Sequence, residues 1–195
     1  VGAMGRVRHG TLMQVKGRYY SIGALLANAC GVVERFEGGH YLTAYLSPRD
    51  YHRVHMPLAG CLRQMTYVPG ALFSVNQSSI NAVDAVFARN ERVICCFDTD
   101  HGEMLVVLVG AAIVGSMVTS WYGEVKSSRR TVMTVHYPPG EVELEKGEEL
   151  GYFQLGSTVV VITQPGLLDS MSVNSEDTLR MGQPMGSLLT SRVLP

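Results

Sequence analysis

The chain has 195 residues, of which 46% are hydrophobic and 17% are charged. That length fits one domain with a sizeable core. The formal net charge of −1 argues against a nucleic-acid-binding surface, which would be basic. No signal-peptide pattern opens the sequence. The apolar run 104–118 is shorter than the roughly 20 residues of a membrane-spanning helix, and Gly110 and Gly115 interrupt it, so it predicts two buried strands.

In chain order, the first predicted helix covers residues 22–28, with Ser21 as a candidate N-cap, and a second covers residues 78–88. Short β-branched runs separated by Gly, Pro and Asp predict strands. These strands are expected at 92–97, 104–109, 131–137, 141–145 and 158–163. Pro138-Pro139-Gly140 separates the third strand from the fourth and predicts a hairpin there. The pattern favours a mainly β (β-rich α+β) fold, a compact barrel or sandwich with a few short helices, as one domain of residues 1–195.

The four cysteines, Cys30, Cys61, Cys95 and Cys96, show no CxxC spacing. Adjacent residues of a strand point to opposite faces, so the side chains of Cys95 and Cys96 are expected to diverge. We therefore expect four reduced, mostly buried thiols in a cytosolic compartment.

The most informative chemical feature is the Gly156-Ser157 bond in front of the run 158–163. The Ser157 hydroxyl can attack the carbonyl of Gly156, because glycine has no Cβ to block the approach. The amide then becomes an ester. Removal of the Ser157 α-proton breaks that ester by elimination, and the resulting dehydroalanine hydrolyses to a pyruvoyl group. On spacing alone, Ser157 would be taken as a turn serine before a strand.

A second candidate group is Tyr51-His52-Arg53-Val54-His55-Met56-Pro57. His52 and His55 are spaced i, i+3, which on a helix would put both on one face and suggest a metal pair. Pro48 and Pro57 disfavour a helix, and no further Cys or His stands at a convincing ligand spacing. A zinc hydrolase using His52 and His55 is therefore the weaker alternative. Histidine titrates near neutral pH, which suits a general base.

At these motifs the sequence resembles the phosphatidylserine decarboxylase family, pyruvoyl-dependent and of the bacterial type. Leu155-Gly156-Ser157-Thr158 resembles the family's self-cleavage motif, and residues 51–57 resemble its histidine motif. The resemblance runs from about Gln14 to about Gly186. Further similar segments lie at 45–50, 72–76, 90–94, 109–116 and 180–184.

The resemblance implies a zymogen that cleaves itself between Gly156 and Ser157. The products would be a β chain, residues 1–156, and an α chain, residues 157–195, with a covalent pyruvoyl group derived from Ser157 as cofactor. The implied activity is decarboxylation of phosphatidylserine to phosphatidylethanolamine in phospholipid biosynthesis. By the same resemblance, His55 is the base of self-cleavage and His52 serves the proton transfer of decarboxylation. No metal is implied.

The resemblance also suggests that Phe73, Ser74, Val75 and Asn76 line the substrate pocket beside the pyruvoyl group. From its pattern alone, that segment is a half-buried strand. Arg53 is a candidate for the phosphate of the lipid head group, because guanidinium groups suit phosphate oxygens. A solvated arginine or a structural ion pair is the ordinary alternative.

The sequence departs from the family pattern at its N-terminal side. The family's helical N-terminal region, and the aspartate that completes its Ser-His-Asp set, match positions upstream of Val1. We therefore expect poor self-cleavage of this chain, and Asp50 is a weak substitute. An inactive, uncleaved binding domain of the same descent is an alternative.

The expected location is the cytoplasmic face of the bacterial inner membrane, as a peripheral protein. The expected partners are phosphatidylserine and the membrane surface, and the cleaved chains should stay associated. A homodimer is left open, and no nucleic acid is expected.

Overall fold

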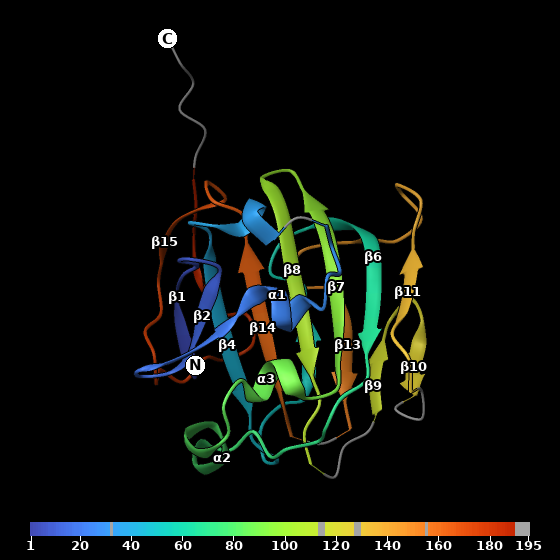
Figure 1. The fold of residues 1–195 in the computed structure, drawn as a ribbon. Coiled ribbons are helices and arrows are strands. Elements are labelled where there is room, and N and C mark those ends of the chain that lie inside the picture. The colour runs from blue at the N-terminus through green and yellow to red at the C-terminus, as the bar shows by residue number, and fades with distance from the viewer. Residues whose placement is uncertain (32, 113–115, 127–129, 155, 190–195) are drawn as a thin grey trace.

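The computed structural model describes residues 1–31, 33–112, 116–126, 130–154 and 156–189. Within these residues, eight strands form one large antiparallel sheet, shown in Figure 1. Its strands are β1 (Ala3–Arg6), β4 (His40–Leu46), β6 (Gly60–Val68), β7 (Arg92–Thr99), β8 (Gly102–Val109), β11 (Met133–His136), β12 (Glu143–Leu144) and β14 (Ser157–Thr163). The spatial order is β1-β4-β14-β8-β7-β6-β11, and β12 also pairs with β6.

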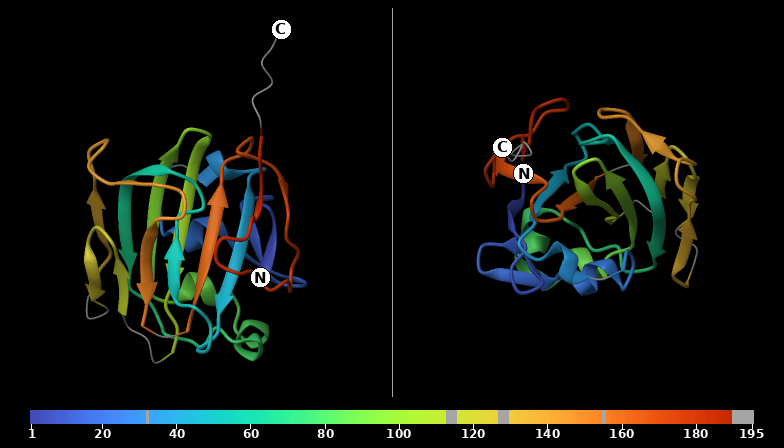
Figure 2. Two further views of the ribbon diagram at one scale, coloured as in Figure 1. Left: turned by 180° about the vertical axis from the view of Figure 1, so that it is seen from behind. Right: turned by 90° about the horizontal axis from the view of Figure 1, so that it is seen from above.

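A second sheet of the described chain has the order β10-β9-β13-β5 and faces the large one. Its strands are β5 (Arg53–His55), β9 (Ser116–Thr119), β10 (Gly123–Lys126) and β13 (Glu149–Phe153). Seen from above, the strands curve around a common interior (Figure 2). Two hairpins lie outside these sheets. They are β2 (Thr11–Val15) with β3 (Arg18–Ser21), and β15 (Leu168–Met171) with β16 (Gly186–Leu188). The mainly β fold predicted from the sequence is confirmed.

The large sheet separates two hydrophobic clusters, and this explains why its central strands are apolar on both faces. In β8, Val107 and Val109 enter the cluster beneath the helices, which we call the helix-side core. Val106 and Leu108 enter the cluster beneath the second sheet, which we call the sheet-side core. The same alternation divides β14. The predicted strands at 92–97, 104–109 and 158–163 are confirmed, each with small differences at its ends.

The helices are short, and a side-chain contact separates the last two. They are α1 (Ile22–Leu26), η1 (Val33–Phe36), α2 (Gln77–Ala82) and α3 (Val86–Arg89). Ser21 caps α1 as predicted, because its Oγ accepts a hydrogen bond from Ala24 N. The single helix predicted at 78–88 is wrong. The buried Gln14 side chain donates to Ile80 O and Val83 O and accepts from Val86 N. These hydrogen bonds interrupt the helix between α2 and α3. None of the described helices has the length and apolar character needed to span a membrane.

The hairpin predicted around Pro138-Pro139-Gly140 is also wrong. β11 and β12 do not pair with each other; each pairs with a different part of β6. Between them, Tyr137 N donates to Arg63 O and Leu62 N donates to Val142 O, each at 2.9 Å. A nine-residue strand such as β6 offers enough free backbone to bind both short strands in line, and that satisfies their polar groups.

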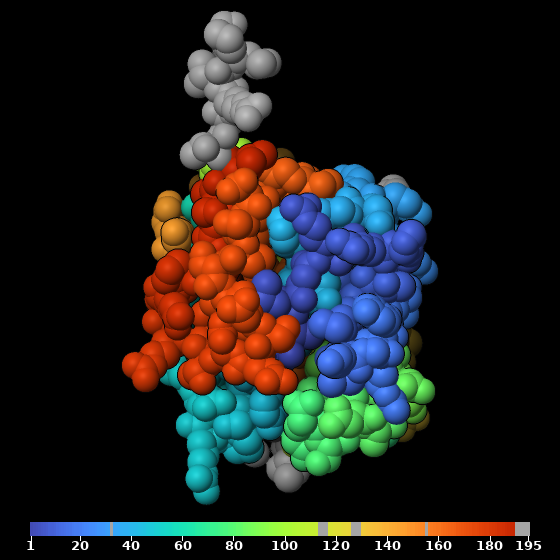
Figure 3. All heavy atoms as spheres, turned by 90° about the vertical axis from the view of Figure 1, so that its left-hand side faces the viewer, coloured from blue at the N-terminus to red at the C-terminus, as the bar shows by residue number. Residues whose placement is uncertain are grey.

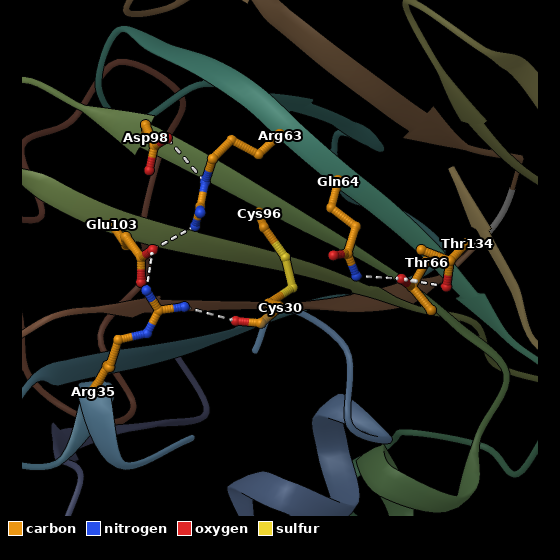
Figure 4. Close-up of a disulfide and its surroundings, with 9 residues drawn as sticks. All are labelled: Cys30, Arg35, Arg63, Gln64, Thr66, Cys96, Asp98, Glu103 and Thr134. Carbon is orange, nitrogen blue, oxygen red and sulfur yellow. Dashed lines mark hydrogen bonds and ion pairs between the residues drawn. A yellow bond between two sulfur atoms is a disulfide. The ribbon is translucent and has the colours of Figure 1, made fainter. Parts of the chain in front are cut away.

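One disulfide contradicts the expectation of four reduced thiols. Cys30 and Cys96 are bonded, with their Cα atoms 6.0 Å apart, whereas Cys61 and Cys95 are free (Figure 4). Cys30 follows α1 with a φ of 61°, and this turn brings it to β7 across a sequence separation of 66. The expectation that Cys95 and Cys96 diverge is confirmed, because Cys95 lies in the sheet-side core and Cys96 in the helix-side core.

Candidate active site

Ser157 opens β14 at the lower end of the large sheet in Figure 1. It pairs with Leu46 of β4, and the next residue, Thr158, pairs with Val109 of β8. The Ser157 side chain is fully buried, and its Oγ has no hydrogen-bond partner among the described residues. A buried hydroxyl without a partner costs free energy, so fold stability does not account for this serine.

Gly156 occupies a tight corner just before the strand. A Cβ at this position would lie 3.4 Å from both Leu46 O and the Pro48 ring. The absence of a side chain therefore lets the chain pass close to Pro48, and it also leaves the Gly156 carbonyl open to attack. Leu155, the first residue of the cleavage motif, lies outside the described residues.

His52 lies at the same Pro48 corner. Its Nε2 is 3.4 Å from Pro48 O, and Phe153 N donates to the His52 carbonyl at 3.0 Å. The His52 Nδ1 is shielded from solvent and has no hydrogen-bond partner in the described part of the chain. Pro48 thus contacts the Gly156 position on one side and His52 on the other. The first predicted histidine and Gly156 thus share Pro48 as a neighbour, and the role of His52 in proton transfer remains a prediction.

His55 is held by other contacts. Its Nδ1 lies 2.9 Å from Gly147 O, and its Nε2 lies 2.8 Å from the Tyr51 hydroxyl. A carbonyl can only accept, so a neutral His55 ring carries its proton on Nδ1 and accepts from Tyr51 at Nε2. The two rings also stack, with centroids 5.8 Å apart. Neither contact is with Ser157, and the role of His55 as the base remains a prediction.

Arg53 and Asp50 both have local partners. The Arg53 guanidinium donates to the Glu149 carboxylate at 2.6 Å and lies over the Tyr152 ring, 5.0 Å from its centroid. The hydrogen bond that Arg53 donates to Glu149 raises the pKa of Arg53. The Asp50 carboxylate accepts from Ser47 N at 2.7 Å, which makes it a turn residue. Binding of a phosphate by Arg53 remains a prediction.

The segment Phe73–Asn76 is bonded to Gly110 through Asn90, a residue that the sequence analysis did not select. The Asn90 side chain bonds both backbone groups of Phe73 and also donates to Gly110 O at 2.8 Å. Gly110 directly follows Val109, the partner of Thr158. Val75 is buried, and Asn76 caps α2 through Ser79 N. The described residues form no strand here, because side chains, and not a neighbouring strand, bond to the backbone of this segment.

Glu91 was also missed. It is 3% exposed, and its Oε1 has no hydrogen-bond partner in the structure as described. A signal was present in the sequence, since Asn90-Glu91-Arg92 places a charged residue directly before a buried strand. We call the group of Ser157, Gly110, Glu91 and His52 the serine end of the sheet.

An apolar groove of about 920 Å³ lies beside this site. It is lined by Leu46, which pairs with Ser157, and by Val54, Val159 and His55. The C-terminal segment 176–186 forms another wall. In Figure 3 that part of the chain, orange to red, covers this face of the molecule above the segment around residue 50, in cyan.

The histidine pair does not belong to a metal cluster in the part of the chain that the structure describes. Across residues 1–31, 33–112, 116–126, 130–154 and 156–189, no group of three or more His, Cys, Asp or Glu side chains could hold a metal ion. The His52 Nε2 and both ring nitrogens of His55 instead face carbonyl oxygens and a hydroxyl.

Comparison with known proteins agrees with this arrangement of motifs. The sequence model of the phosphatidylserine decarboxylase family matches residues 1–187. The phosphatidylserine decarboxylase proenzyme of Pseudomonas fluorescens Pf-5 is 47% identical over 190 residues, which cover 95% of this chain and 66% of that protein. The proenzyme of Ectopseudomonas mendocina is 48% identical, covering 96% and 67%. That of Pseudomonas aeruginosa PAO1 is 52% identical, covering 85% and 58%.

The chain thus spans between 58% and 67% of the length of these relatives. Similarity extends over both the histidine motif and the cleavage motif, since the matched residues 1–187 include them. This chain belongs to the phosphatidylserine decarboxylase family.

Proposed function

We propose that this chain is a zymogen that cleaves itself between Gly156 and Ser157 and then decarboxylates phosphatidylserine to phosphatidylethanolamine with a pyruvoyl group at position 157. The observation that carries the proposal is the buried Ser157 Oγ without a partner, directly after a glycine. The chain belongs to a family named for this reaction, and its relatives are proenzymes.

Self-cleavage requires a base for the Ser157 hydroxyl, and we assign this role to His55. In the present arrangement Tyr51 donates to the His55 Nε2, while Gly147 O fixes the opposite nitrogen. The Nε2 lone pair becomes available when Tyr51 withdraws. Tyr51 is 52% exposed, so its movement needs no rearrangement of the core. The hydrogen bond to Gly147 would keep the ring in the required tautomer.

The residues around Ser157 fit a ketone made from that serine. The site is closed to solvent at Ser157, and Val159 of the same strand face belongs to the sheet-side core. When present, the pyruvoyl group supplies an electron sink for the electrons released as CO₂ leaves. His52 would hold and deliver the proton that the substrate carbon then takes up. Its unpartnered, solvent-shielded Nδ1 supports this assignment.

The groove and its surroundings support a lipid substrate. Leu46, Val54 and Val159 give an apolar wall, Leu46 pairs with Ser157, and Arg53 also lines the groove. We assign Phe73, Ser74, Val75 and Asn76 to the substrate pocket, because Asn90 ties this segment to Gly110. We propose a peripheral protein at the cytoplasmic face of the bacterial inner membrane, with the cleaved chains 1–156 and 157–195 associated.

Intact-mass measurement of the expressed protein tests this function. The expected result is slow and incomplete separation into two chains at Gly156–Ser157, with a blocked N-terminus on the second, and only a single chain for Ser157→Ala. Ser170→Ala, an exposed serine paired with Ser187, is the matched control and should cleave like the parent. A single parental chain without metal would favour an inactive binding domain, and a single chain with stoichiometric zinc would favour a zinc hydrolase.

A further inference from the structure

Glu91 is a buried carboxyl group that the proposed reaction does not yet use. It directly precedes β7, and the alternation along that strand places it on the face of Val93, in the sheet-side core. Its side chain is 3% exposed. Tyr67 supplies one hydrogen bond to the carboxyl, but Oε1 has no partner within the described chain. Buried carboxyl oxygens are normally paired, so this one calls for a function.

The strand register places Glu91 and Ser157 on the same face with only Gly110 between them. Arg92 and Thr158 both pair with Val109 from opposite sides of β8. One residue further along, Gly110 N donates to Glu91 O at 2.9 Å. Ser157 and Glu91 are therefore separated by two strand spacings, or about 10 Å between Cα atoms.

Gly110 contributes no side chain between them. A side chain at this position would stand on the sheet-side face, between the serine and the carboxyl. Because glycine has none, no side chain at position 110 separates Ser157 from Glu91, whose carboxyl also bonds to Tyr67 of β6, on the other side of β7. The unpartnered atoms Ser157 Oγ and Glu91 Oε1 thus face the same interior.

The surroundings favour the protonated form of Glu91 more than those of an exposed glutamate would. Burial raises its pKa, and the hydrogen bond from Tyr67 opposes this only in part. A carboxylic acid kept neutral by an apolar site can donate a hydrogen bond to an oxygen that gains negative charge.

We propose that Glu91 is a further functional residue of this site, a carboxylic acid that donates a hydrogen bond across Gly110 to the oxyanion formed when Ser157 Oγ adds to the Gly156 carbonyl. This inference rests on the proposed self-cleavage. Because Oγ must bond to the carbonyl carbon, that carbon comes to the face on which Oγ and Glu91 lie.

The bonds balance in this step without loss of the Glu91 proton. The Oγ–C bond forms while the carbonyl electrons move to oxygen, where Glu91 stabilises the charge. The C–N bond then breaks, the oxyanion returns to a carbonyl, and the proton lost from Oγ ends on the Ser157 nitrogen. The product is an ester between Gly156 and Ser157. Loss of one oxyanion donor typically slows such a step about 10²–10³-fold.

Hydroxylamine cleavage of the whole chain tests the inference, because hydroxylamine attacks the ester and releases two fragments. We expect Glu91→Leu, which keeps bulk but has no donor, to release fragments about 10²–10³-fold more slowly than the parent. Glu91→Gln keeps an N–H donor and should stay within about tenfold. Glu103→Gln, another buried glutamate but at the other end of the sheet, is the matched control and should match the parent.

The outcomes separate the two proposals. A folded Glu91→Leu chain, with the circular dichroism spectrum of the parent, that forms ester at the parental rate overturns the inference alone. A parent that releases no fragment overturns self-cleavage and this inference together. A second readout is independent of cleavage: infrared difference spectra between the parent and Glu91→Gln should contain the carbonyl band of a protonated carboxylic acid at pH 7. A carboxylate band in its place would contradict the assigned protonation state.

Discussion

The two ends of the large sheet differ in whether their buried polar groups have hydrogen-bond partners. At the far end, the turn between β7 and β8 gathers Arg35, Arg63, Asp98, Glu103 and Gln164, which we call the hairpin end. There Glu103 Oε1 accepts from Arg35 at 2.8 Å and from Arg63, and Oε2 accepts from Gln164 at 2.9 Å. Figure 4 shows both arginines reaching this carboxylate. At the serine end, Glu91 Oε1, Ser157 Oγ and His52 Nδ1 have no such partners among the described residues.

This difference separates structure from chemistry. The hairpin end pairs its carboxylates with guanidinium groups, even where the angle is poor, as between Arg63 Nε and Asp98 at 2.9 Å. Such ion pairs between distant segments stabilise the folded structure. The serine end keeps donors and acceptors unpaired inside an apolar interior, which costs stability and leaves those atoms available to reacting groups. If the two ends divide these tasks, substitutions at the serine end should change the reaction and substitutions at the hairpin end should change stability.

The largest effect is expected from Ser157→Ala. Alanine has no hydroxyl to form the ester, so cleavage and decarboxylation should both be lost. The unfolding free energy should not fall, because the change removes a buried hydroxyl without a partner. Gel analysis, a decarboxylation assay and chemical denaturation measure these properties. Two chains from this variant would contradict the role of Ser157.

The two histidines should separate the two stages of the reaction. We expect His55→Ala to block cleavage, and His52→Ala to allow cleavage while lowering turnover by about 10²–10⁴-fold, the usual contribution of a positioned proton donor. Cleavage is read by mass and turnover by CO₂ release. Equal loss of activity in two normally processed variants would show that the division of roles is wrong.

Among the contacts that stabilise the fold, the disulfide should contribute more to the unfolding free energy than any single ion pair. Cys30→Ser, or reduction of the Cys30–Cys96 bond, should lower the unfolding free energy by about 2–4 kcal/mol, because the bond closes a long loop. Ester formation at Ser157 should not change. Denaturation with and without reductant measures the unfolding free energy, and hydroxylamine cleavage measures ester formation. Cys61→Ser, at a free thiol, is the control.

Glu103→Gln should weaken the hairpin end by about 1 kcal/mol, since both arginine partners are partly exposed and water screens the pairs. Cleavage should continue at the parental rate. Chemical denaturation of parent and variant measures the loss. A variant of unchanged stability with slowed cleavage would reverse the division between the two ends.

The smallest effect concerns the dependence of stability on pH. Burial raises the pKa of Glu91, so the folded state holds that proton more tightly than the unfolded state. The unfolding free energy should therefore fall as pH rises above the ordinary glutamate pKa of about 4.3. Glu91→Gln should be more stable than the parent at pH 7 and gain less at pH 4. Denaturation at both values tests the sign, and a variant less stable than the parent at pH 7 would refute it.

Local patterns in the sequence were enough to predict the central strands and the position of the cleavage bond. The apolar runs in β8 and β14 are buried on both faces, and burial of that kind is visible in composition. Gly156-Ser157 stands directly before a β-branched run, so its place at the start of a strand followed from its neighbours.

Long-range pairing could not be predicted in the same way. The contacts of Gln14 with Ile80 and Val83 join residues 66 and 69 positions apart, and the disulfide spans 66 positions. The in-line pairing of β11 and β12 with β6 depends on the length of a distant strand. Glu91 became a candidate only when the register placed Gly110 beside Ser157, because one sequence shows adjacency along the chain and not across a sheet.

The place of β14 in the sheet has a consequence for the protein after cleavage. Residues 157–162 are paired with β4, and residues 158–163 with β8, so both sides of this strand are hydrogen-bonded. A backbone cut in front of Ser157 would create no new sheet edge. Separation of the two products would have to open both ladders and expose two unpaired edges, each prone to aggregation. We therefore expect the cut chain to remain one folded particle without any covalent link between its parts.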